Sequence, residues 1–530
     1  MSFSTPPCPG RVFVVGAGPG DPKLLTLRGL ECLRQADIVL YDGLVNSQIL
    51  RDARTGTPCI RVSKDGKQGT IRRAEVSRQM VELARQGKIV LRLKAGDPAM
   101  FGRVAEESEA LAEQGVPFEI VPGITAALAA ASYAGIPLTH RDHASAVALI
   151  AVPDEPGKGE AALDYGTLAK FPGTLAFYMA THQVDAWTSE LIRAGKSPDT
   201  PAAIVCRCSF PDQLCLRCRL DEVARKLQAT VSAAAGPGPA VEGHRPPDAL
   251  PLPAVVIVGT AAGLDDALSW FDKRPLFGQR VLVTRPGDRA GPLADALAEL
   301  GAEVLVQPAI CISDPPDWRP VDDALQRLPR YDWLVFSSAN GVAYLLNRLL
   351  ASGGDLRRLG GVRLAAIGPG TADALAAYHL KADLIPGEFR AEALAAALAE
   401  EASGKRFLLA RASRGREVLA EQLRAAGAVV DQVVVYSSTD VDLADEGISR
   451  RLAAGEIQWV TVTSSAIARS LVALFGADLR KTRLASISPI TSATLRNLGY
   501  EPAVEAGEYT MPGVVQVIRA AVLAQAMETG

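Results

Sequence analysis

A glycine-containing turn placed directly after a short apolar strand is the first feature of the sequence that suggests chemistry. Residues 12–22 read VFVVGAGPGDP, so three glycines follow the strand in alternate positions. Glycines let the backbone approach a ligand closely, and Pro22 can open the next helix. One interpretation is a dinucleotide site in which Asp42, at the end of the second strand, holds a ribose. That interpretation requires a glycine at position 21, where the sequence has Asp21.

The elements that position this turn follow a strand, glycine turn, helix order, which predicts α/β domains with mainly parallel sheets. Short apolar strands are expected at 11–15, 36–41, 88–93 and 117–121. Residues 231–253 are rich in Ala, Gly and Pro and are expected to form a flexible loop. The apolar strand 254–258 completes the same domain, so the domain boundary is expected near 273–277.

The second half of the chain repeats itself. Residues 363–371 read RLAAIGPGT and residues 483–491 read RLASISPIT, while WLVFSS at 333–338 is echoed by WVTVTS at 459–464. A third pair, 280–310 and 406–436, shares the plan of strand, arginine turn, amphipathic helix, Gly–Ala and strand. Three matched segments in one order favour two similar α/β lobes over chance similarity. A cleft between two such lobes is the natural place for a ligand.

The bulk composition limits the classes of function. At 530 residues the chain is too long for one core, so we expect two to four domains. A net charge of −3 argues against nucleic acid or an anionic membrane as the main partner, although local arginine clusters leave a polyanionic substrate open. The N-terminus lacks the pattern of a secretory signal. Residues 123–139 suggest a tightly packed helix rather than a membrane span. The eight cysteines lack the density of a disulfide scaffold, so we expect a cytoplasmic protein.

Five further motifs in the first half carry a family resemblance. They read GAGPGDPKLL at 16–25, YDGLV at 41–45, LRLKAGDPAMFGR at 91–103, VPGITAA at 121–127 and AGIPLTHR at 134–141. In this order they resemble the uroporphyrinogen-III C-methyltransferases, from about residue 10 to 272. The resemblance implies the tetrapyrrole-methylase fold, with α/β subdomains at about 10–140 and 141–272 and S-adenosyl-L-methionine (SAM) bound between them.

The resemblance also implies a set of site residues. The residues expected to bind SAM are Pro19, Ala95, Gly96, Asp97, Met100, Thr125, Ala126, Met179 and Cys208. Asp97 can accept hydrogen bonds from a ribose or an amino group. After methyl transfer to a pyrrole carbon a base must remove a proton, and the family points to Asp42 for this role, with Lys64 as proton donor. From position alone, Asp42 is equally a turn residue at the end of a strand.

The sequence departs from the family at several of these positions. The family usually has two glycines where this chain has Ala95 and Gly96, a Gly–Gly pair where Val104 and Ala105 stand, and a glycine at Cys208. A Thr–Gly–His motif of the family is Ala–Val–Pro at 151–153. Side chains at 95 and 208 together could narrow the SAM site. A weakened or lost methyltransferase, with a binding or dimerisation role, is therefore an alternative.

Cys206, Cys208, Cys215 and Cys218 fall within 13 residues, which invites a metal-site interpretation. The family resemblance instead places them on a strand–turn–strand hairpin around 211–213. Cys206 and Cys208 would then share one face, while Cys215 and Cys218 would face opposite sides. We therefore expect no metal, and small buried or incidental thiols instead. His140 and His143 lie near the expected SAM site. A role as hydrogen-bonded loop residues explains them at least as well as a catalytic role.

Residues from about 276 to 522 resemble uroporphyrinogen-III synthase. The motifs are VLVTRP at 281–286, FSSANGV at 336–342, AIGPGT at 366–371, Val435–Tyr436 and ISPIT at 487–491. The resemblance implies an interleaved bilobal fold, with lobe one at 276–312 plus 438–522 and lobe two at 314–436. This division agrees with the internal repeat.

The synthase reaction closes a flexible octacarboxylate, hydroxymethylbilane, into a ring. Backbone amides at helix starts and Ser or Thr hydroxyls suit carboxylates without demanding high net charge. The candidates for substrate binding are Arg285, Ser338, Asn340, Thr371, Ser464, Ser465 and Thr491. Tyr436 matches the tyrosine that the family places by the leaving hydroxyl, although a strand-end aromatic packed at the lobe junction is the alternative.

The sequence thus predicts a bifunctional enzyme. Its second half is expected to make uroporphyrinogen III, and its first half to add two methyl groups and give precorrin-2, toward sirohaem or cobalamin. Methylase relatives suggest a homodimer through the first half. The alternatives left open are an active synthase fused to a degraded methylase and, more distantly, a nicotinamide oxidoreductase.

Overall fold

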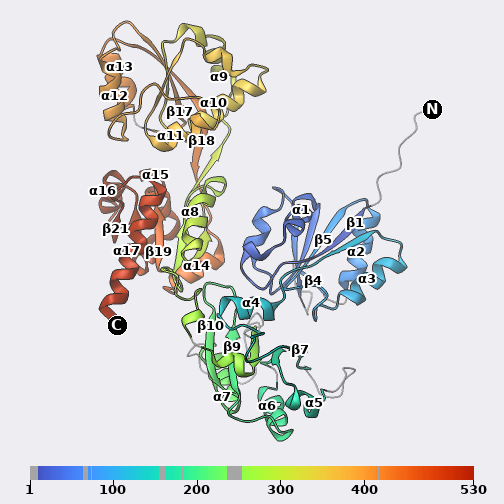
Figure 1. Cartoon of the computed structure of the whole chain (residues 1–530). Coiled ribbons are helices and arrows are strands. Elements are labelled where there is room, and N and C mark those ends of the chain that lie inside the picture. The colour runs from blue at the N-terminus through green and yellow to red at the C-terminus, as the bar shows by residue number, and fades with distance from the viewer. Residues whose placement is uncertain are drawn as a thin grey trace, which may run out of the picture. The chain divides into compact units, whose positions relative to one another are not determined.

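The computed structural model describes residues 10–63, 70–72, 75–153, 163–181, 183–234, 253–264, 266–415 and 417–529. The chain separates into two compact units, unit 1 (residues 1–278) and unit 2 (residues 279–530) (Figure 1). Among the described helices, none combines the length and the apolar composition needed to cross a lipid bilayer.

A six-stranded parallel sheet in the order β4-β3-β2-β5-β1-β6 forms the first part of unit 1. Its strands are β1 (Arg11–Gly16), β2 (Ile38–Asp42), β3 (Cys59–Ser63), β4 (Thr70–Arg72), β5 (Ile89–Lys94) and β6 (Phe118–Val121), and its helices are α1 (Leu27–Gln35), α2 (Val76–Arg85) and α3 (Val104–Glu113). The four strands expected from the sequence are all present, within two residues at each end.

Helices cover both faces of this sheet. On β1, Val12 and Val14 pack toward α2 and α3, whereas Phe13 and Val15 pack toward α1. Strands buried on both faces are apolar throughout, which explains the uninterrupted apolar run of β1. Because the strands are parallel, their carboxyl ends meet at one edge of the sheet, and the glycine turn and Asp42 lie at that edge.

A second sheet, in the order β10-β9-β11-β8-β7, completes unit 1. Its strands are β7 (Val147–Ala151), β8 (Thr174–Tyr178), β9 (Pro201–Cys206), β10 (Leu214–Arg219) and β11 (Ala254–Val258), and its helices are α4 (Ala126–Tyr133), α5 (Tyr165–Lys170), α6 (Val184–Arg193) and α7 (Val223–Ala234). Only β7 and β8 pair in parallel, so the expectation of mainly parallel sheets is wrong here. One physical reason is the short connection from β9 to β10, which only antiparallel strands can make. Strand β11 also runs antiparallel to both of its neighbours, β8 and β9.

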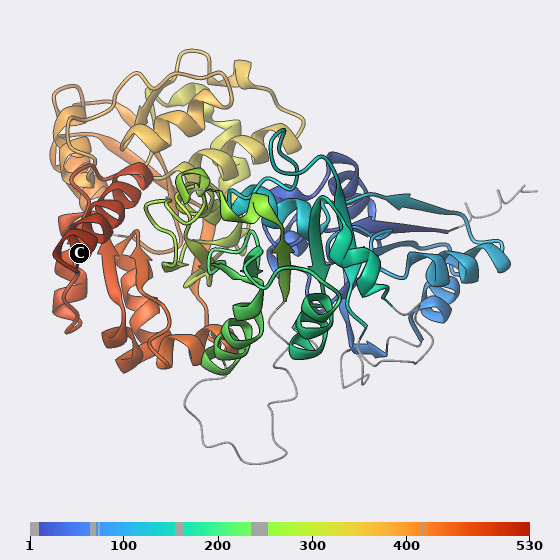
Figure 2. The same cartoon turned by 60° about the horizontal axis from the view of Figure 1, so that its bottom comes forward.

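The two faces of this second sheet are covered differently. Helices α6 and α7 lie side by side on one face (Figure 2). On this face Phe177 stacks on Trp187, with ring centroids 4.4 Å apart. The alanine-rich α4 packs on the other face, against Ala176 and Ala203. Helix α7 continues to Ala234, so the loop does not begin at residue 231 as expected, and residues 235–252 lie outside the described part of the chain.

Unit 2 contains one sheet in each of two lobes. Lobe one has the parallel order β13-β12-β19-β20-β21, and lobe two has the order β14-β18-β17-β15-β16, in which β14 is antiparallel to β18. The elements of lobe one are β12 (Arg280–Val283), α8 (Gly287–Glu299), β13 (Glu303–Val306), α14 (Glu446–Ala453), β19 (Trp459–Val462), α15 (Ser465–Phe475), β20 (Arg483–Ser486), α16 (Pro489–Asn497), β21 (Val504–Glu505) and α17 (Met511–Thr529). Those of lobe two are β14 (Ile310–Ser313), α9 (Arg319–Gln326), β15 (Trp333–Phe336), α10 (Ala339–Ala351), β16 (Arg363–Ala366), α11 (Pro369–Ala376), α12 (Ala391–Ala399), β17 (Arg406–Ala412), α13 (Val418–Ala425) and β18 (Val429–Asp440).

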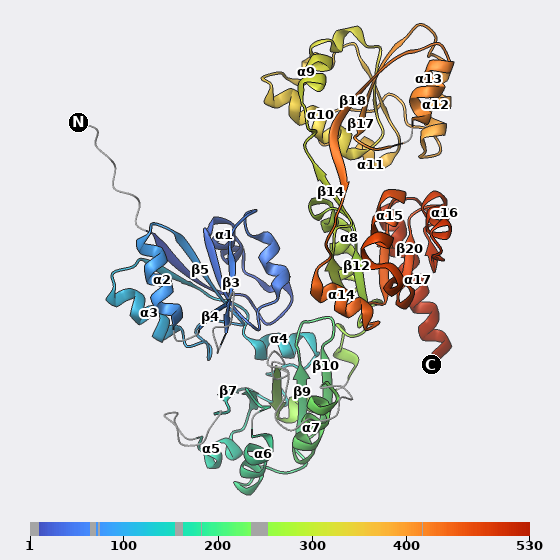
Figure 3. The same ribbon diagram turned by 180° about the vertical axis from the view of Figure 1, so that it is seen from behind.

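The internal repeat of the sequence falls on equivalent positions of the two lobes. Strands β12, β19 and β20 are neighbours in lobe one, and β17, β15 and β16 are neighbours in the same order in lobe two. The chain enters lobe two through β14 and leaves it through the long β18, and Figure 3 shows this pair of strands passing between the lobes. The repeat is therefore a property of the fold rather than a chance similarity.

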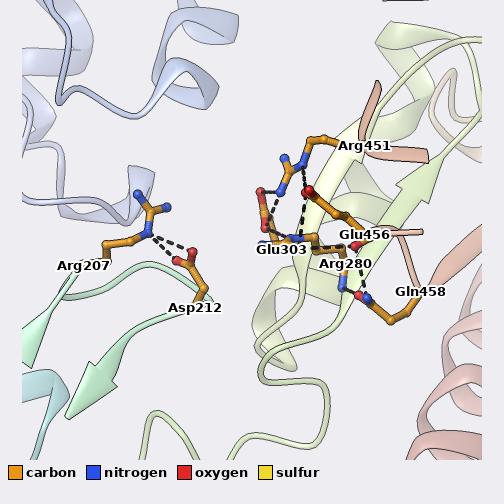
Figure 4. A network of polar contacts seen from close by, with 7 residues as sticks. All are labelled: Arg207, Asp212, Arg280, Glu303, Arg451, Glu456 and Gln458. Carbon is orange, nitrogen blue, oxygen red and sulfur yellow. Dashed lines mark hydrogen bonds and ion pairs between the residues drawn. The ribbon is translucent and has the colours of Figure 1, made fainter. Parts of the chain in front are cut away.

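An ion-pair network holds the beginning of lobe one against its later segments (Figure 4). Arg280 Nε donates to Glu303 Oε2 at 2.8 Å, and Arg451 Nη2 donates to the same oxygen at 3.0 Å. The backbone N–H of Arg280 donates to Gln458 Oε1 at 2.8 Å, and Glu456 lies within 4 Å of both arginines. These contacts thus hold together segments of lobe one that are far apart in the sequence. Figure 4 also shows the separate Arg207–Asp212 pair of unit 1.

Candidate functional site

Three turns at the carboxyl edge of the first sheet are fixed to one another. Gly18 and Gly96 exchange backbone hydrogen bonds of 3.1 and 2.8 Å, and their φ angles of +74° and +68° favour glycine at both positions. A Cβ on Gly16 would lie 2.6 Å from the Cα of Gly123. The glycines of the sequence motif therefore allow the turns after β1, β5 and β6 to pack without side chains between them.

Asp97 holds two of these turns through its carboxylate. Its Oδ1 accepts a hydrogen bond from the backbone N–H of Ala99 at 2.8 Å, and its Oδ2 accepts one from the backbone N–H of Gly123 at 2.9 Å. The structure therefore gives Asp97 a positioning role within the loops. Its expected hydrogen bond to a ligand stays a prediction.

The start of α4 is held by a tyrosine that the sequence reasoning missed. The hydroxyl of Tyr178 lies 2.7 Å from Thr125 Oγ1 and accepts from the backbone N–H of Ala127 at 2.9 Å. Burial raises the pKa of Tyr178, so its phenol stays protonated. Met179 follows with φ of +54° and is 42% exposed. The structure therefore brings together three residues expected at the SAM site, Thr125, Ala126 and Met179. In the sequence, the tyrosine directly before Met179 was the only hint of this contact.

The glycine turn is also anchored to the second part of unit 1. The backbone N–H of Asp21 donates to Ser209 Oγ at 3.0 Å, and the Tyr133 hydroxyl donates to Asp21 Oδ2 at 2.9 Å. Pro19, in the same turn, is half-buried. Helix α1 begins only at Leu27, so the turn does not lead directly into a long helix as a dinucleotide site requires. The dinucleotide interpretation is therefore not supported.

The residues at which this chain departs from the family pattern pack in different clusters of side chains. Ala95 packs against the cluster beneath α1, and Val104 packs against the cluster beneath α2 and α3. Cys208 instead lies with Met100 and Ala126 in the cluster around α4, and its thiol donates to the Ala126 carbonyl with Sγ 3.7 Å from the oxygen. Burial raises the pKa of Cys208 to about 12. The side chain of Cys208 thus lies against Ala126, a residue expected to bind SAM.

Asp42, the expected base, belongs to a cluster of charges that sequence reasoning did not assemble. Its Oδ1 accepts a hydrogen bond from Arg92 Nη2, and Arg92 Nε donates to Glu107 Oε1 at 3.2 Å. Lys94 Nζ donates to the same Glu107 oxygen at 2.8 Å. Among the described residues Asp42 Oδ2 has no hydrogen-bond partner, and the Asp42 side chain is 20% exposed. Lys64, the expected proton donor, lies outside the described residues.

Burial dominates the electrostatics of this charge cluster. Arg92 is only 1% exposed and lies within β5, between Leu91 and Leu93. Burial and the charge of Arg92 lower the pKa of Lys94, against the opposing effect of Glu107. Glu107 Oε2 is buried and has no hydrogen-bond partner in the described part of the chain. Charged residues are almost never fully buried unless they are paired, so Arg92 within the strand motif was the signal that could have found the cluster.

The four clustered cysteines pack into two different cores. Cys206 and Cys218 contact the cluster beneath α6 and α7, whereas Cys208 and Cys215 contact the cluster around α4. The expectation that Cys206 and Cys208 share one face is wrong, because β9 ends at Cys206 and Arg207 has φ of +48°, which breaks the alternation of side chains. Within the described residues, no group of three His, Cys, Asp or Glu side chains could hold a metal ion.

His140 and His143 lie in one short turn. His140 N–H donates to the Ala144 carbonyl at 2.8 Å, and the Ala144 N–H donates back to the His140 carbonyl at 2.9 Å. Their ring centroids are 4.7 Å apart. This arrangement supports their interpretation as loop residues.

In unit 2, Tyr436 and Ser338 meet at a pocket of about 250 Å³ in lobe two. Their hydroxyl oxygens are 3.0 Å apart, and Ser338 Oγ also accepts from the backbone N–H of Gly341 at the start of α10. Tyr436 is 7% exposed. The pocket lies at the carboxyl ends of β15 and β17. The sequence reasoning missed the other polar residues that line it, which include Arg411, Arg414 and Gln432.

The remaining substrate candidates are divided between the lobes. Thr371 and Asn340 lie in the first turns of α11 and α10 in lobe two, and Thr371 is 5% exposed. In lobe one, Ser464 caps α15, Ser465 Oγ accepts from Thr494 Oγ1, and Thr491 is 2% exposed beside Ser488. Arg285 donates to Met511 Sδ at 2.6 Å, at the start of α17. Their roles in substrate binding stay predictions.

Comparison with known proteins places two families on the chain. Residues 11–224 match the model of the tetrapyrrole (corrin/porphyrin) methylases, and residues 291–516 match that of uroporphyrinogen-III synthase HemD. The porphyrin biosynthesis protein HemD of Ruminiclostridium josui is 34% identical over 507 residues, covering 96% of this chain and 95% of that protein. The uroporphyrinogen-III C-methyltransferase of Bacillus subtilis (strain 168) is 35% identical, over 66% of this chain and 68% of that protein. A solved uroporphyrin-III C-methyltransferase from Thermus thermophilus, complexed with S-adenosylhomocysteine, is 37% identical over 48% of this chain and 93% of its own, with a TM-score of 0.37.

Proposed function

Because the chain belongs to the family that joins a tetrapyrrole methylase to a uroporphyrinogen-III synthase, we propose that it performs these two steps in succession. Unit 2 cyclises hydroxymethylbilane to uroporphyrinogen III. Unit 1 then methylates this product twice with SAM and gives precorrin-2, the precursor of sirohaem and cobalamin. The observation that carries the proposal is the convergence of the glycine turns, α4 and Asp42 at one edge of unit 1.

The surroundings of the glycine turns fit a SAM molecule. A Cβ on Gly96 would meet nothing closer than 3.9 Å, so the backbone at this position is open to close approach. The exposed side chains of Met179 and Phe101 flank Tyr178, and they offer apolar contacts. The other residues that would hold SAM are Pro19, Ala95, Asp97, Met100, Thr125, Ala126 and Cys208. When bound, SAM supplies an electrophilic methyl group.

The chain's own chemistry in unit 1 is proton removal. Methyl transfer to a pyrrole carbon leaves a proton that a base must accept. Asp42 offers its Oδ2 for it, which accepts no hydrogen bond from any described residue. The buried guanidinium of Arg92 fixes the other oxygen and so orients the carboxylate. Lys64 is the proposed proton donor. Dry alignment of donor and acceptor can lower such a barrier by up to about 7–11 kcal/mol.

In unit 2 the proposed chemistry is loss of a hydroxyl. The Tyr436 phenol donates a hydrogen bond to the leaving hydroxyl of the linear substrate, and Ser338 holds the phenol at 3.0 Å. The carboxylates of the substrate are proposed to be positioned by helix starts and by polar side chains near them. The helix starts are those at Ser338, Thr371, Ser464 and Thr491, and the further side chains are those of Asn340, Ser465 and Arg285. Without a strong base among these residues, catalysis depends on positioning.

A single incubation with hydroxymethylbilane and SAM tests both activities, with the product mass as the readout. We expect a macrocycle carrying two added methyl groups. Asp42→Asn should lower methylation about 10²- to 10⁴-fold and leave ring closure unchanged. Tyr436→Phe should slow ring closure by about tenfold or less and leave methylation of supplied uroporphyrinogen III unchanged. Unmethylated uroporphyrinogen III from the wild-type chain would instead support the degraded methylase, which the contact of Cys208 with Ala126 favours.

We further propose a cytoplasmic homodimer formed through unit 1, with no nucleic acid or membrane partner. The net charge of −3 supports the absence of a polyanionic macromolecular partner. Light scattering after gel filtration of the full chain and of its isolated unit 2 would test the dimer. Unit 2 alone should then be monomeric.

A further inference from the structure

The pocket of lobe two beside Tyr436 carries charge that the proposed ring closure does not use. Arg411 and Arg414 line it, and none of the described residues in its lining is Asp or Glu. The apolar part of its lining is formed by Val335, Leu409, Leu419 and the alanines of β17, α12 and α13. Other polar groups in the lining come from Ser337, Ser338, Gln432 and Tyr436. The pocket therefore combines an apolar wall with two guanidinium groups.

Neighbouring groups hold both arginines in place. Arg411 Nη1 donates to Gln432 Oε1 at 2.9 Å and pairs with Glu417, which lies outside the pocket lining. Arg414 donates from Nε to Ser438 Oγ at 3.2 Å and from Nη1 to Asp440 Oδ1 at 2.8 Å. These bonds restrict the two guanidinium groups before any ligand binds, which reduces the entropy lost on binding.

One donor of this pair has no acceptor among the described residues. Arg414 Nη2 is buried, and no described residue accepts a hydrogen bond from it. A buried charged donor without a partner is costly, and such groups are rare in folded proteins. Because Arg414 lines the pocket, a carboxylate that binds there would offer an acceptor to its guanidinium. Arginine is suited to this because its fork matches carboxylate geometry.

The size of the pocket limits its occupant. A volume of about 250 Å³ is below the roughly 300–1,000 Å³ typical of pockets for drug-sized ligands, so it cannot enclose a whole tetrapyrrole. A single flat ring with short acidic side chains matches its volume, its apolar wall and its two cations. Ser338 and Tyr436 also line the pocket, so such a ring would lie beside the hydroxyl pair of the proposed reaction.

We propose that this pocket is a binding subsite for one carboxylate-bearing pyrrole ring of the linear substrate, with Arg414 and Arg411 receiving its carboxylates. The proposal rests on the proposed ring closure and adds to it the residues that select an acidic ring. It also assigns Arg414 a second role besides its contact with Asp440 at the end of β18.

The test measures ring closure by the full chain at varied hydroxymethylbilane concentration. Arg414→Gln should raise KM about 10- to 100-fold, the loss expected for a hydrogen bond to a charged group, and change kcat by less than about threefold. Arg411→Gln should also raise KM. Asp440→Asn is the matched control, because it removes the negative charge that pairs with Arg414 and keeps the arginine. It should leave KM within about threefold of the wild-type value. Equal effects of Arg414→Gln and Asp440→Asn would overturn the proposal and leave Arg414 a purely structural residue.

A binding measurement separates this inference from the proposed function. The probe is a monopyrrole with one acetate and one propionate chain, titrated calorimetrically into the full chain, with its diester as the uncharged control. The acid should bind the wild type and lose affinity about tenfold or more in Arg414→Gln, while the diester should bind weakly to both. If the wild type closes the ring but Arg414→Gln changes neither KM nor probe affinity, the subsite is refuted and the synthase function stands. If the wild type does not close the ring, the proposed function fails even where the probe binds through Arg414.

Discussion

Replacing Tyr178 by phenylalanine tests how unit 1 holds the start of α4. The substitution removes only the hydroxyl that bridges Thr125 and the backbone N–H of Ala127, at 2.7 and 2.9 Å. The ring keeps its contact with Phe101, whose centroid is 4.9 Å away. The change therefore isolates two hydrogen bonds from the packing of the aromatic ring.

The expected magnitude follows from those two bonds. Each is worth about 0.5–1.5 kcal/mol, so the free energy of unfolding of unit 1 should fall by about 1–3 kcal/mol. Thr125 and Ala126 are expected to contact SAM, so a loosened helix start should also weaken binding of S-adenosylhomocysteine by about threefold to tenfold. Brief proteolysis in a urea series, with peptides identified by mass, follows the unfolding of each unit separately, and calorimetry gives the affinity.

Two further variants make the test specific. Thr125→Val should destabilise unit 1 in the same way, and the double variant should lose less than the sum of the two single losses, because both share one hydrogen bond. Tyr331→Phe removes a comparable phenol bond, 2.6 Å from Tyr331 to Asp431, in unit 2. It should destabilise unit 2 and leave the affinity for S-adenosylhomocysteine unchanged. An unaltered urea midpoint of unit 1 in Tyr178→Phe would refute the reasoning.

Three other predictions concern the ion pairs and thiols. Burial opposes ionisation of Glu303, but the hydrogen bond from Arg280 and the charge of Arg451 outweigh it and lower the pKa of Glu303. The stability that ionised Glu303 contributes is present above the ordinary carboxyl pKa and is lost as the pH falls through the pKa of the folded state. Lowering the pH from about 5 to 3 should therefore reduce the free energy of unfolding of unit 2 more steeply in the wild type than in Glu303→Gln. Equal dependence on pH in the two proteins would contradict this prediction. Cys208→Leu should weaken S-adenosylhomocysteine binding about tenfold or more by crowding Ala126, whereas Cys208→Gly should change it less than about threefold, as calorimetry would show. At pH 8 iodoacetamide should label the exposed Cys311 quickly, while buried Cys208, whose pKa is raised to about 12, should react only after unfolding, which peptide mass analysis would reveal.

The local and repeated features of the chain could be predicted from the sequence. Strand β11 has the expected bounds, because an apolar run bounded by Pro253 and Gly259 leaves few alternatives. The repeat of 363–371 at 483–491 places β16 and β20 at equivalent positions of two sheets. Gly18 was expected near a ligand from the glycine pattern after the first strand, and Gly96 from the family resemblance. Both have positive φ angles, which favour glycine. These are properties of neighbouring residues and of spacing.

The partners of the functional side chains were decided by the tertiary structure. Asp42 and Arg92 are 50 residues apart, and Arg92 reaches Asp42 because β2 and β5 are neighbours in the sheet. The sequence placed Cys206 and Cys208 on one face, and a single backbone angle at Arg207 separated them. The pairing of Ser338 with Tyr436, 98 residues later, depends likewise on sheet order.

The sequence by itself determined which segments become strands and turns, and which two families the chain resembles. Those choices depend on hydrophobic periodicity and on the steric freedom of glycine, which act over a few residues. Only the tertiary structure decided which charges are paired, which thiols are buried and which arginines line a pocket. Hydrogen bonds and ion pairs act over a few ångströms in space, so their partners are known only once distant segments of the chain have been brought together.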